Sequence, residues 1–497
     1  MIHPRAVMRD QRGVALPLAL IALLILTMLV LTVLNLGAVE PQISKNLSDT
    51  ARARHMAEAG IEWAFDCLAD QDLSAFLAGP DGAQNTSDDQ GATSVAGQNI
   101  AARMDATFCP NSPPPGTLPG LGAGTGTFAV TIRNDSIPAT GGYAGDQVLT
   151  GVAVDGGGKF TDTNGIVILT ATGAYGTSTR QITAVISRNT LTVNAAASLP
   201  GFQADTYMQT VGTQTIDGRD WLRTDSNGSS PTGTGPLRFG ITTQPGTQAN
   251  LGITYEQNVE NAFNTVPLQN TIQGKSQVTG SLVSGLPTIA PDSALTPAAM
   301  QSFLTKLAAN PATTIIQSSM ACPLVLTGTT GAPTAPTLST AGSSCPGNPP
   351  IGSTVNLGTP ADPKLIYFRG ELDTSSNFTG LKLLGAVKGA GILVIEDGDL
   401  SISTSGAGLS IQGRGVDFYW DGIVIVSGRY VGTGFRAGSN AEIRGAFVSY
   451  EAIWNEAAGY YEFLSQANTL AIRNSTQNIN TALRAAYNQR IISWREN

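Results

Sequence analysis

The N-terminal part of the chain carries a long apolar run, and a helical pattern continues beyond it. Residues 14–34 contain no charged side chain and are apolar apart from two threonines. As an α-helix these 21 residues span roughly 30 Å, the thickness of the hydrocarbon layer of a bilayer. Between Ile43 and Leu68, apolar residues recur at helical spacing among charged ones. The pattern predicts one helix of about 80 Å over residues 14–68, which Pro41 is expected to kink or locally melt.

Beyond residue 124 the pattern changes to the alternation of β-strands. Segments between residues 125 and 190 alternate apolar and polar residues between Gly and Asp turns, which predicts an antiparallel β-meander. The region 195–364 is rich in Gly, Thr, Pro and Asn and has weak periodicity, so we expect loops and short strands there. One helix is predicted at 296–308, with Thr296 as its N-cap.

From residue 365 the strands become richer in Val and Ile. Runs such as 392–395 and 423–426 are continuously apolar, as in strands buried on both faces. Short units that each end in a turn predict a parallel β-helix or β-roll, although their irregular spacing leaves a β-sandwich open. Residues 480–494 are predicted to form a terminal helix that covers one end of the stack.

Charges next to the apolar run predict how the chain sits in a membrane. Arg5, Arg9 and Arg12 precede it, with only Asp10 in opposition. The positive-inside rule therefore places the N-terminus in the cytoplasm and sends the rest of the chain across the membrane. A cleaved secretory signal has an apolar region of about 7–15 residues, so a membrane anchor is the better interpretation of this longer run.

Composition argues against nucleic-acid binding and against most hydrolase chemistry. The 497 residues include 28 Lys and Arg against 36 Asp and Glu, a net charge of −8, which disfavours binding to a phosphate backbone. The only histidines, His3 and His55, lie in the N-terminal segment and on the amphipathic helix, so Ser-His-Asp and Cys-His catalysis are excluded. We therefore expect that the protein is not an enzyme.

One enzymatic alternative rests on carboxylates of the β-rich C-terminal part. On a β-helix, four aspartates could supply a polysaccharide-cleaving pair, although they are first of all turn residues between strands: Asp397, Asp399, Asp417 and Asp421. Tyr419 and Trp420 could instead offer an apolar face for sugar binding, unless Trp420 belongs to the core.

The four cysteines form two widely separated pairs, and none has a metal-ligand spacing. If the chain is exported, Cys67–Cys109 and Cys322–Cys345 are the natural disulfides, although four cysteines allow three connectivities and the alternative is four buried thiols.

The loop 79–91 offers oxygen ligands of the type that Ca²⁺ prefers, from Asp81, Asn85, Asp88 and Asp89. Its spacing is not that of an EF-hand, and a solvated turn explains the same residues.

The N-terminal features together resemble a known family. The basic leader, Arg12-Gly13, the uncharged helix from Val14 and the segment ARHMAEAGIEWA at 53–64 resemble the N-terminal region of type IV pilus minor pilins, the PilX-type assembly subunits. The resemblance implies a class III signal, in which prepilin peptidase cuts after Gly13 and leaves Val14 as the new N-terminus. It also implies other pilins and pilus assembly proteins as partners in the inner membrane.

One position departs from the family pattern. Most pilins carry a glutamate at the fifth mature position, where it pairs with the terminal amine of the preceding subunit; here that position is Leu18. A subunit that lacks this pair suits the start or tip of a filament, unless PilX-like subunits simply tolerate an apolar residue there. The resemblance implies an inner-membrane protein that later reaches the periplasm or a surface pilus, where it attaches to a carbohydrate or protein receptor.

The predicted fold class is α+β, with a long pilin-like helix, an antiparallel meander and a β-rich C-terminal domain. We expect five parts: a leader, the membrane and amphipathic helix, the meander head, a loop-rich region and a β-solenoid-like domain with a terminal helix, at 1–13, 14–70, 71–194, 195–364 and 365–497. The alternatives to a minor pilin are a minor pseudopilin of type II secretion and a membrane-tethered, carbohydrate-active β-helix.

Overall fold

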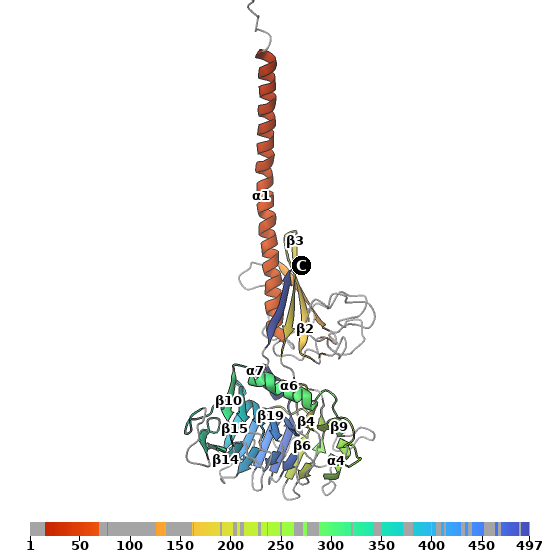
Figure 1. Ribbon diagram of the computed structural model, residues 1–497, viewed down its shortest axis with the longest axis vertical. Coiled ribbons are helices and arrows are strands. Elements are labelled where there is room, and N and C mark those ends of the chain that lie inside the picture. Colours follow the sequence, from red (N-terminus) through yellow and green to blue (C-terminus); the bar gives the residue numbers. More distant parts are fainter. Residues whose placement is uncertain are drawn as a thin grey trace, which may run out of the picture.

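The chain folds into a rod, a small sheet and a large β-rich body, arranged in line (Figure 1). The computed structural model describes the following residues: 15–68, 77, 126–135, 162, 164–188 and, with gaps, 191–496. The fold class is α+β, as predicted: a long N-terminal helix is followed by antiparallel and parallel sheets, and the C-terminal region is rich in strands.

Helix α1 (Ala15–Leu68) is a single helix of 54 residues, in agreement with the apolar and amphipathic patterns. It is continuous through Pro41, so the local melting expected there is not observed. A proline removes one N–H and crowds the turn before it. The carbonyl that its ring crowds belongs to the residue four positions earlier, Gly37, whose backbone adjusts more readily than that of a residue with a side chain. Residues 15–37 and 39–47 are exposed, and we call the segment 15–47 the stem.

The second half of α1 packs on a four-stranded antiparallel sheet, and together they form the head. The order of its strands is β1 (Thr127–Asn134), β2 (Ile166–Tyr175), β3 (Ser178–Ser187) and β24 (Arg490–Glu496). Buried side chains of α1 meet every second residue of β1, β2 and β3, the alternation that the sequence predicted for a meander. Residues 147–154, which the sequence places in the same meander as a further strand, lie outside the described residues.

The C-terminal segment differs from the prediction. Helix α7 (Thr476–Ala486) ends before the predicted helix does, and residues 490–496 form β24, which pairs with β3. Two consecutive isoleucines and a tryptophan suit a strand better than a helix. Helix α7 also packs on the face of a sheet, against β15, β19 and β21, and does not cover the end of a stack. All residues between β3 and β24 are thus inserted into the head sheet.

This insertion, residues 191–486, forms what we call the distal domain. Its large sheet contains eleven parallel strands: β10 (Thr313–Gln317), β13 (Lys364–Arg369), β15 (Val387–Glu396), β19 (Phe418–Gly428), β21 (Asn440–Glu451), β23 (Thr469–Asn474), β6 (Thr213–Asp217) and β8 (Ile272–Gln273), with β4 (Ala195–Leu199), β7 (Phe239–Thr243) and β9 (Ile289–Pro291) on a branch.

Smaller sheets lie behind the large one. Their strands are β12 (Thr337–Thr340), β11 (Leu324–Gly328), β14 (Leu381–Gly385) and β16 (Leu400–Ser403); β20 (Thr433–Phe435), β22 (Phe463–Ser465) and β5 (Thr206–Met208); and the hairpin β17 (Leu409–Ile411) and β18 (Arg414–Val416). From β13 to β23 the chain alternates between the two layers, and neighbours in each layer pair in parallel, apart from the antiparallel hairpin β17–β18. Strands from 195–364 and from 365–497 belong to the same sheets.

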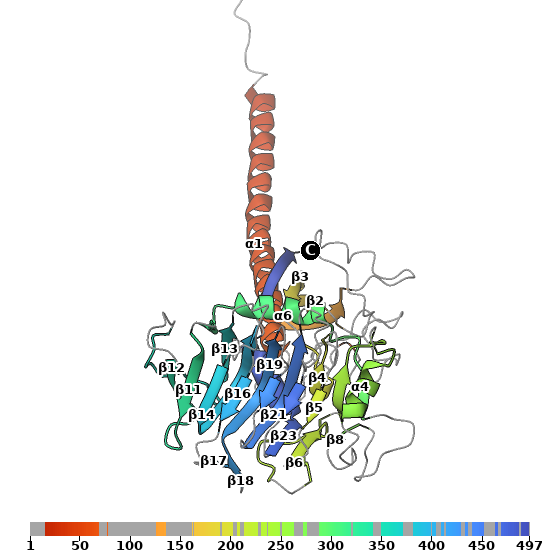
Figure 2. The same cartoon turned by 60° about the horizontal axis from the view of Figure 1, so that its bottom comes forward.

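The distal domain has two apolar layers. The inner layer lies between the sheets and includes Phe368, Phe418, Trp420 and Phe447. The outer layer lies between the large sheet and two helices, α7 and α6 (Pro297–Ala308) (Figure 2). Helix α6 is where the sequence predicted it, and the Thr296 hydroxyl accepts a hydrogen bond from the Ala299 amide at 3.2 Å, as an N-cap should. A short helix, α4 (Tyr255–Ala262), flanks the branch strands.

Candidate functional site

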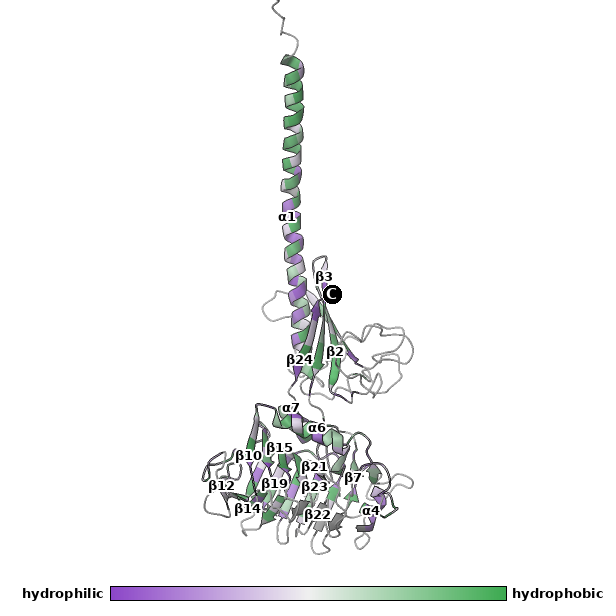
Figure 3. Cartoon of the chain, in the orientation of Figure 1, coloured by the Kyte–Doolittle hydropathy of each residue, from purple (hydrophilic) through white to green (hydrophobic). Residues whose placement is uncertain are grey.

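The stem is the most unusual surface of the molecule. Its large apolar side chains are about half exposed or more, and none of its most apolar window is buried. Figure 3 shows that the residues of this part of α1 are mostly hydrophobic. Within the part of the chain that the structure describes, α1 is the one helix long and apolar enough to cross a membrane. Leu18 lies on this surface, and Glu40 is the first carboxylate after it. An apolar rod of this length needs lipid or other helices around it.

Several predicted site residues fall outside the described residues. They include Gly13 and Val14 of the cleavage site and the four calcium ligands of the loop 79–91: Asp81, Asn85, Asp88 and Asp89. Within the described ranges, no group of three or more His, Cys, Asp or Glu side chains is arranged to hold a metal ion. Cleavage and calcium binding therefore remain predictions.

Two cysteines are described, and both are oxidised. Cys67 and Cys322 are each disulfide-bonded, and no described cysteine is free. The other two, Cys109 and Cys345, lie outside the described residues, so the pairing itself remains a prediction.

The segment 53–64, which carries the family resemblance, is the contact face of α1. Ala53, Ala57 and Ile61 are fully buried against the sheet. A Cβ atom on Gly60 would lie 3.0 Å from the Phe128 ring, so this position needs a very small residue. Packing therefore explains the small residues of this segment, because they let the helix approach the strands closely.

The charged residues of the same segment lie on the outer side of α1. Glu58 accepts hydrogen bonds from Arg54 at 3.0 Å and from His55 at 2.9 Å. Burial acts to raise the pKa of Glu58, but the hydrogen bonds and charges of His55 and Arg54 outweigh it, and the net pKa is lowered. His55 thus takes part in a local pair with Glu58 on the surface of the helix.

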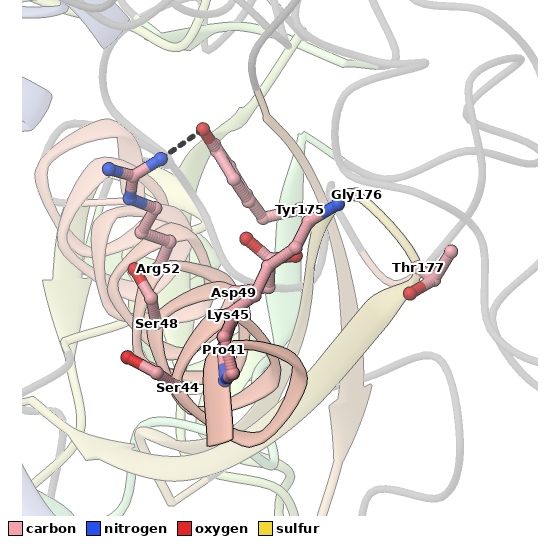
Figure 4. Close-up of a pocket in the computed structure, with 9 residues that line it drawn as sticks. All are labelled: Pro41, Ser44, Lys45, Ser48, Asp49, Arg52, Tyr175, Gly176 and Thr177. Atoms are coloured by element: carbon pink, nitrogen blue, oxygen red, sulfur yellow. Dashed lines mark hydrogen bonds between the residues drawn. The ribbon is translucent and has the colours of Figure 1, made fainter. Parts of the chain in front are cut away.

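A polar hollow of about 660 Å³ opens where the stem meets the head (Figure 4). It lies between α1 and the β2–β3 turn and is lined by Pro41, Ser44, Lys45, Ser48, Asp49, Arg52, Tyr175, Gly176 and Thr177. Arg52 Nη1 donates a hydrogen bond to the Tyr175 hydroxyl, and its guanidinium lies 4.9 Å from the centre of the Tyr175 ring. This pair closes one side of the hollow and fixes the turn to the helix.

Asp49 is the buried charge of this hollow. Asp49 is 9% exposed, and its carboxylate has no hydrogen bond or ion pair with any described residue. Gly176 has a φ of 59°, and a Cβ there would approach Asp49 Oδ2 to 3.2 Å. This hollow was not predicted from the sequence. Its signal was a carboxylate at position 49, on the same helix face as the buried Ala53 and Met56.

The carboxylates considered for polysaccharide cleavage do not form an accessible pair. Asp417 and Asp421 are buried, at 4% and 3% exposure. Asp417 Oδ2 accepts a hydrogen bond from the Asn440 amide at 3.0 Å. Asp397 is in a turn, with a φ of 52°, and Asp399 lies outside the described residues. A polysaccharide has no access to Asp417 or Asp421 in this fold.

The suggested sugar-binding face is wrong. Trp420 is fully buried between the sheets, where its ring stacks on that of Phe418 with 6.2 Å between the ring centres. Tyr419 is 2% exposed. The alternation along β19 places Trp420 in the inner apolar layer, whereas Tyr419, on the opposite face of the strand, packs with Ala386, Leu409 and Val416. Both residues belong to the core of the distal domain.

Buried charges form a network on the outer side of the large sheet. Glu442 Oε1 accepts hydrogen bonds from Arg444 Nε at 2.7 Å and from Arg473 Nη1 at 2.5 Å, and all three residues are at most 4% exposed. Both guanidinium groups lie near the Trp221 ring, at 5.8 and 4.6 Å from its centre. Trp221 Nε1 donates to Asp217 Oδ2 at 2.9 Å. The network fixes the loop after β6 onto the sheet.

Asp421 extends this network towards α7. Its Oδ1 accepts hydrogen bonds from Asn478 Nδ2 at 2.8 Å and from the Tyr419 hydroxyl at 3.1 Å, and Arg223 Nε lies 3.9 Å from Oδ2. Burial raises the pKa of Asp421, and the nearby positive charges oppose this only in part.

The raised pKa of Asp421 predicts a pH-dependent effect of substitution. Because the pKa of Asp421 is raised in the native state, its carboxyl stays protonated there at pH values just above the ordinary pKa of an aspartate, whereas in the unfolded state it has already lost the proton. The stability of the parent therefore falls as the pH rises above that ordinary pKa. Asp421→Asn removes this fall. We expect the stability of the variant relative to the parent to increase as the pH rises above about 4, the ordinary pKa of an aspartate; urea unfolding at a series of pH values measures it. Parallel pH profiles would contradict the raised pKa.

Comparisons with known proteins add little to this geometry. No family model and no curated protein matches the sequence. A solved structure, the crystal structure of the competence-associated pilin ComZ from Thermus thermophilus, aligns over 90% of this chain and 97% of its own, with 12% sequence identity and a TM-score of 0.27. A TM-score this low carries no argument about fold or function, so the role of this chain has to be inferred from its own residues.

Proposed function

We propose that the protein is a minor pilin-like subunit of a type IV pilus or a related filament. The observation that supports this most is the continuity of α1: an exposed apolar stem long enough to cross a bilayer runs without a break into a helix packed on the head sheet. Lipid would surround the stem before assembly, and the helices of other subunits would surround it in the filament.

We propose that this subunit primes assembly or lies at the tip. The distal domain is attached to the end of the head that points away from the stem (Figure 1). A body of this size on each subunit would crowd a helically packed fibre, and Leu18 cannot supply the carboxylate that an interior subunit would use. At the tip, the distal domain would be free to attach to a surface carbohydrate or protein.

The finer assignments belong to the same proposal. Prepilin peptidase would remove residues 1–13 by cutting after Gly13, in the inner membrane and on its cytoplasmic side. The mature chain would remain anchored there until other pilins and assembly proteins incorporate it. No catalytic step is part of the proposed role, and the two described cysteines, both oxidised, suit an exported protein.

Fibre purification followed by N-terminal sequencing tests the proposal. The chain should be present in sheared, purified fibres, should begin at Val14, and should be labelled by immunogold at fibre ends. Gly13→Val should leave the chain uncut and confined to the membrane, while a substitution at an exposed position of the distal domain, such as Leu251→Ser, should change neither result. If cells make the protein but their fibres lack it, the proposal is refuted. If the protein is recovered with a secretion apparatus instead, it belongs to a pseudopilus.

A further inference from the structure

The hollow between α1 and the β2–β3 turn contains charges of both signs that do not pair with each other. Asp49 is the buried member of its lining, and its carboxylate has no hydrogen bond or ion pair with any described residue. Ser44, Lys45 and Ser48 line the hollow as exposed residues at its rim. Because burying a carboxylate costs free energy unless a donor or a positive charge compensates it, Asp49 is placed to receive a positively charged group.

Neither cation of the hollow neutralises Asp49. Arg52 donates a hydrogen bond to the Tyr175 hydroxyl, and its guanidinium lies 4.9 Å from the centre of the Tyr175 ring, so the turn holds it (Figure 4). Lys45 precedes Asp49 by four residues, which is the less favourable order for an ion pair on a helix, and the two form none. The hollow thus offers a carboxylate and a separate ammonium to a ligand.

The hollow opens on a face of α1 that continues into the stem. Pro41, Ser44 and Ser48 are three or four residues apart, so they lie on one face of the helix. Gly37, four residues before Pro41, lies on the same face, and nothing lies within 4 Å of a Cβ at that position. An acyl chain can therefore lie against the stem directly beside the hollow.

The length of the apolar segment places the hollow at the level of the lipid headgroups. No charged residue occurs from Val14 to Val39, and this segment forms about 39 Å of helix, more than the roughly 30 Å of the hydrocarbon layer. A helix that is too long tilts, and a tilt of about 40° brings Glu40 to the edge of the hydrocarbon. Lys45 then lies about 6 Å further out, within a headgroup layer of about 5–7 Å. Helix side chains point towards the N-terminus, so Asp49 reaches back towards this layer.

We propose that the hollow binds the headgroup of a membrane lipid that carries a phosphate and a primary ammonium; this inference rests on the membrane-anchored state of the proposed function. The lipid ammonium donates charge-assisted hydrogen bonds to the Asp49 carboxylate. The lipid phosphate accepts hydrogen bonds from Lys45 and from the hydroxyls at the rim, and the acyl chains extend along the stem past Gly37.

Ligands of a single charge fit the hollow less well. A divalent cation prefers at least about six oxygen ligands, usually from several carboxylates, whereas Asp49 is the one carboxylate of the lining and the positive charges of Lys45 and Arg52 repel a metal ion. An anion alone would be attracted to Lys45 but repelled by Asp49. A zwitterion satisfies both charges of the hollow.

Lipid binding by the purified full chain in detergent tests the proposal. Native mass spectrometry measures the dissociation constants of phosphatidylethanolamine and phosphatidylcholine. The choline headgroup has the same phosphate but no N–H to donate, so we expect the parent to prefer phosphatidylethanolamine about tenfold and Asp49→Asn to reduce this preference to less than about twofold. Circular dichroism should show that Asp49→Asn folds like the parent, because the carboxylate has no partner among the described residues to lose.

Two further variants separate the two halves of the headgroup. Lys45→Gln removes a contact to the phosphate that both lipids share, so it should weaken the binding of both and leave their ratio unchanged. Glu40→Gln is the matched control, because Glu40 lies nearer the membrane than Asp49 but does not line the hollow; it should leave the preference intact. A parent without preference, or a Glu40→Gln effect equal to that of Asp49→Asn, would overturn the proposal.

A soluble competitor shows whether the ligand is a lipid. Glycerophosphoethanolamine carries the same headgroup without acyl chains, and we expect it to bind at least about a hundredfold more weakly than the lipid, because it has no apolar chain to bury. Equal affinity would mean that the hollow takes a free zwitterion, and the assignment to lipid would be wrong. None of these measurements involves fibres, so loss of the lipid preference would leave the pilin role standing, and absence from fibres would leave the lipid preference standing.

Discussion

Glu442→Ala is expected to lower the free energy of unfolding of the distal domain by about 3–5 kcal/mol. The carboxylate is 1% exposed and accepts hydrogen bonds from both Arg444 and Arg473, which are themselves buried. Removing it takes away the carboxylate to which both buried guanidinium groups donate, and breaking a buried ion pair by deleting one partner is strongly destabilising. Urea unfolding followed by far-UV circular dichroism measures the change.

A matched ion pair on the same sheet provides the control. Glu396 pairs with Arg369 at 3.1 Å, but the Arg369 side chain is 42% exposed. Glu396→Ala should therefore cost only about 0–1 kcal/mol. Equal losses for the two substitutions would mean that water reaches the Glu442 network, and the stabilising role inferred for it would fail.

Local sequence patterns were sufficient for the elements whose partners are close in the chain. The apolar run and the amphipathic spacing predicted α1 almost to its ends, and Thr296 marked the start of α6. The Val- and Ile-rich runs at 392–395 and 423–426 are indeed central parallel strands, buried on both faces. In each case the information lies within a few turns of helix or within one strand.

Contacts between distant segments could not be predicted in this way. β24 was assigned to a helix because its pairing partner, β3, is separated from it by the whole distal domain. Within β21, Glu442 and Arg444 look like solvent-facing residues of an alternating strand. They are buried only because a loop that contains Trp221, more than 200 residues earlier, covers them. The hollow at Asp49 has the same cause, since Tyr175 reaches it from the sheet.

Gly173→Val is expected to detach the helix from the head sheet. A Cβ at residue 173 would lie 2.1 Å from the Ala53 carbonyl oxygen and 2.4 Å from the Ala57 amide nitrogen. Both are backbone atoms of α1, so no side-chain rotation can relieve the overlap, and the whole helix has to move away from β2. We expect a loss of about 3 kcal/mol or more for the head, seen as an earlier thermal transition.

Gly331→Val is the matched control, because nothing lies within 4 Å of a Cβ at this position of the distal domain. Its effect should stay within about 0.5 kcal/mol. Limited proteolysis adds a second measurement: in the Gly173 variant, cleavage should appear in the second half of α1, while the distal domain should resist as in the parent. Unchanged protection of α1 would show that the helix can be held by β1 and β3 alone. Close approach at Gly173 would then not be what joins the stem to the head.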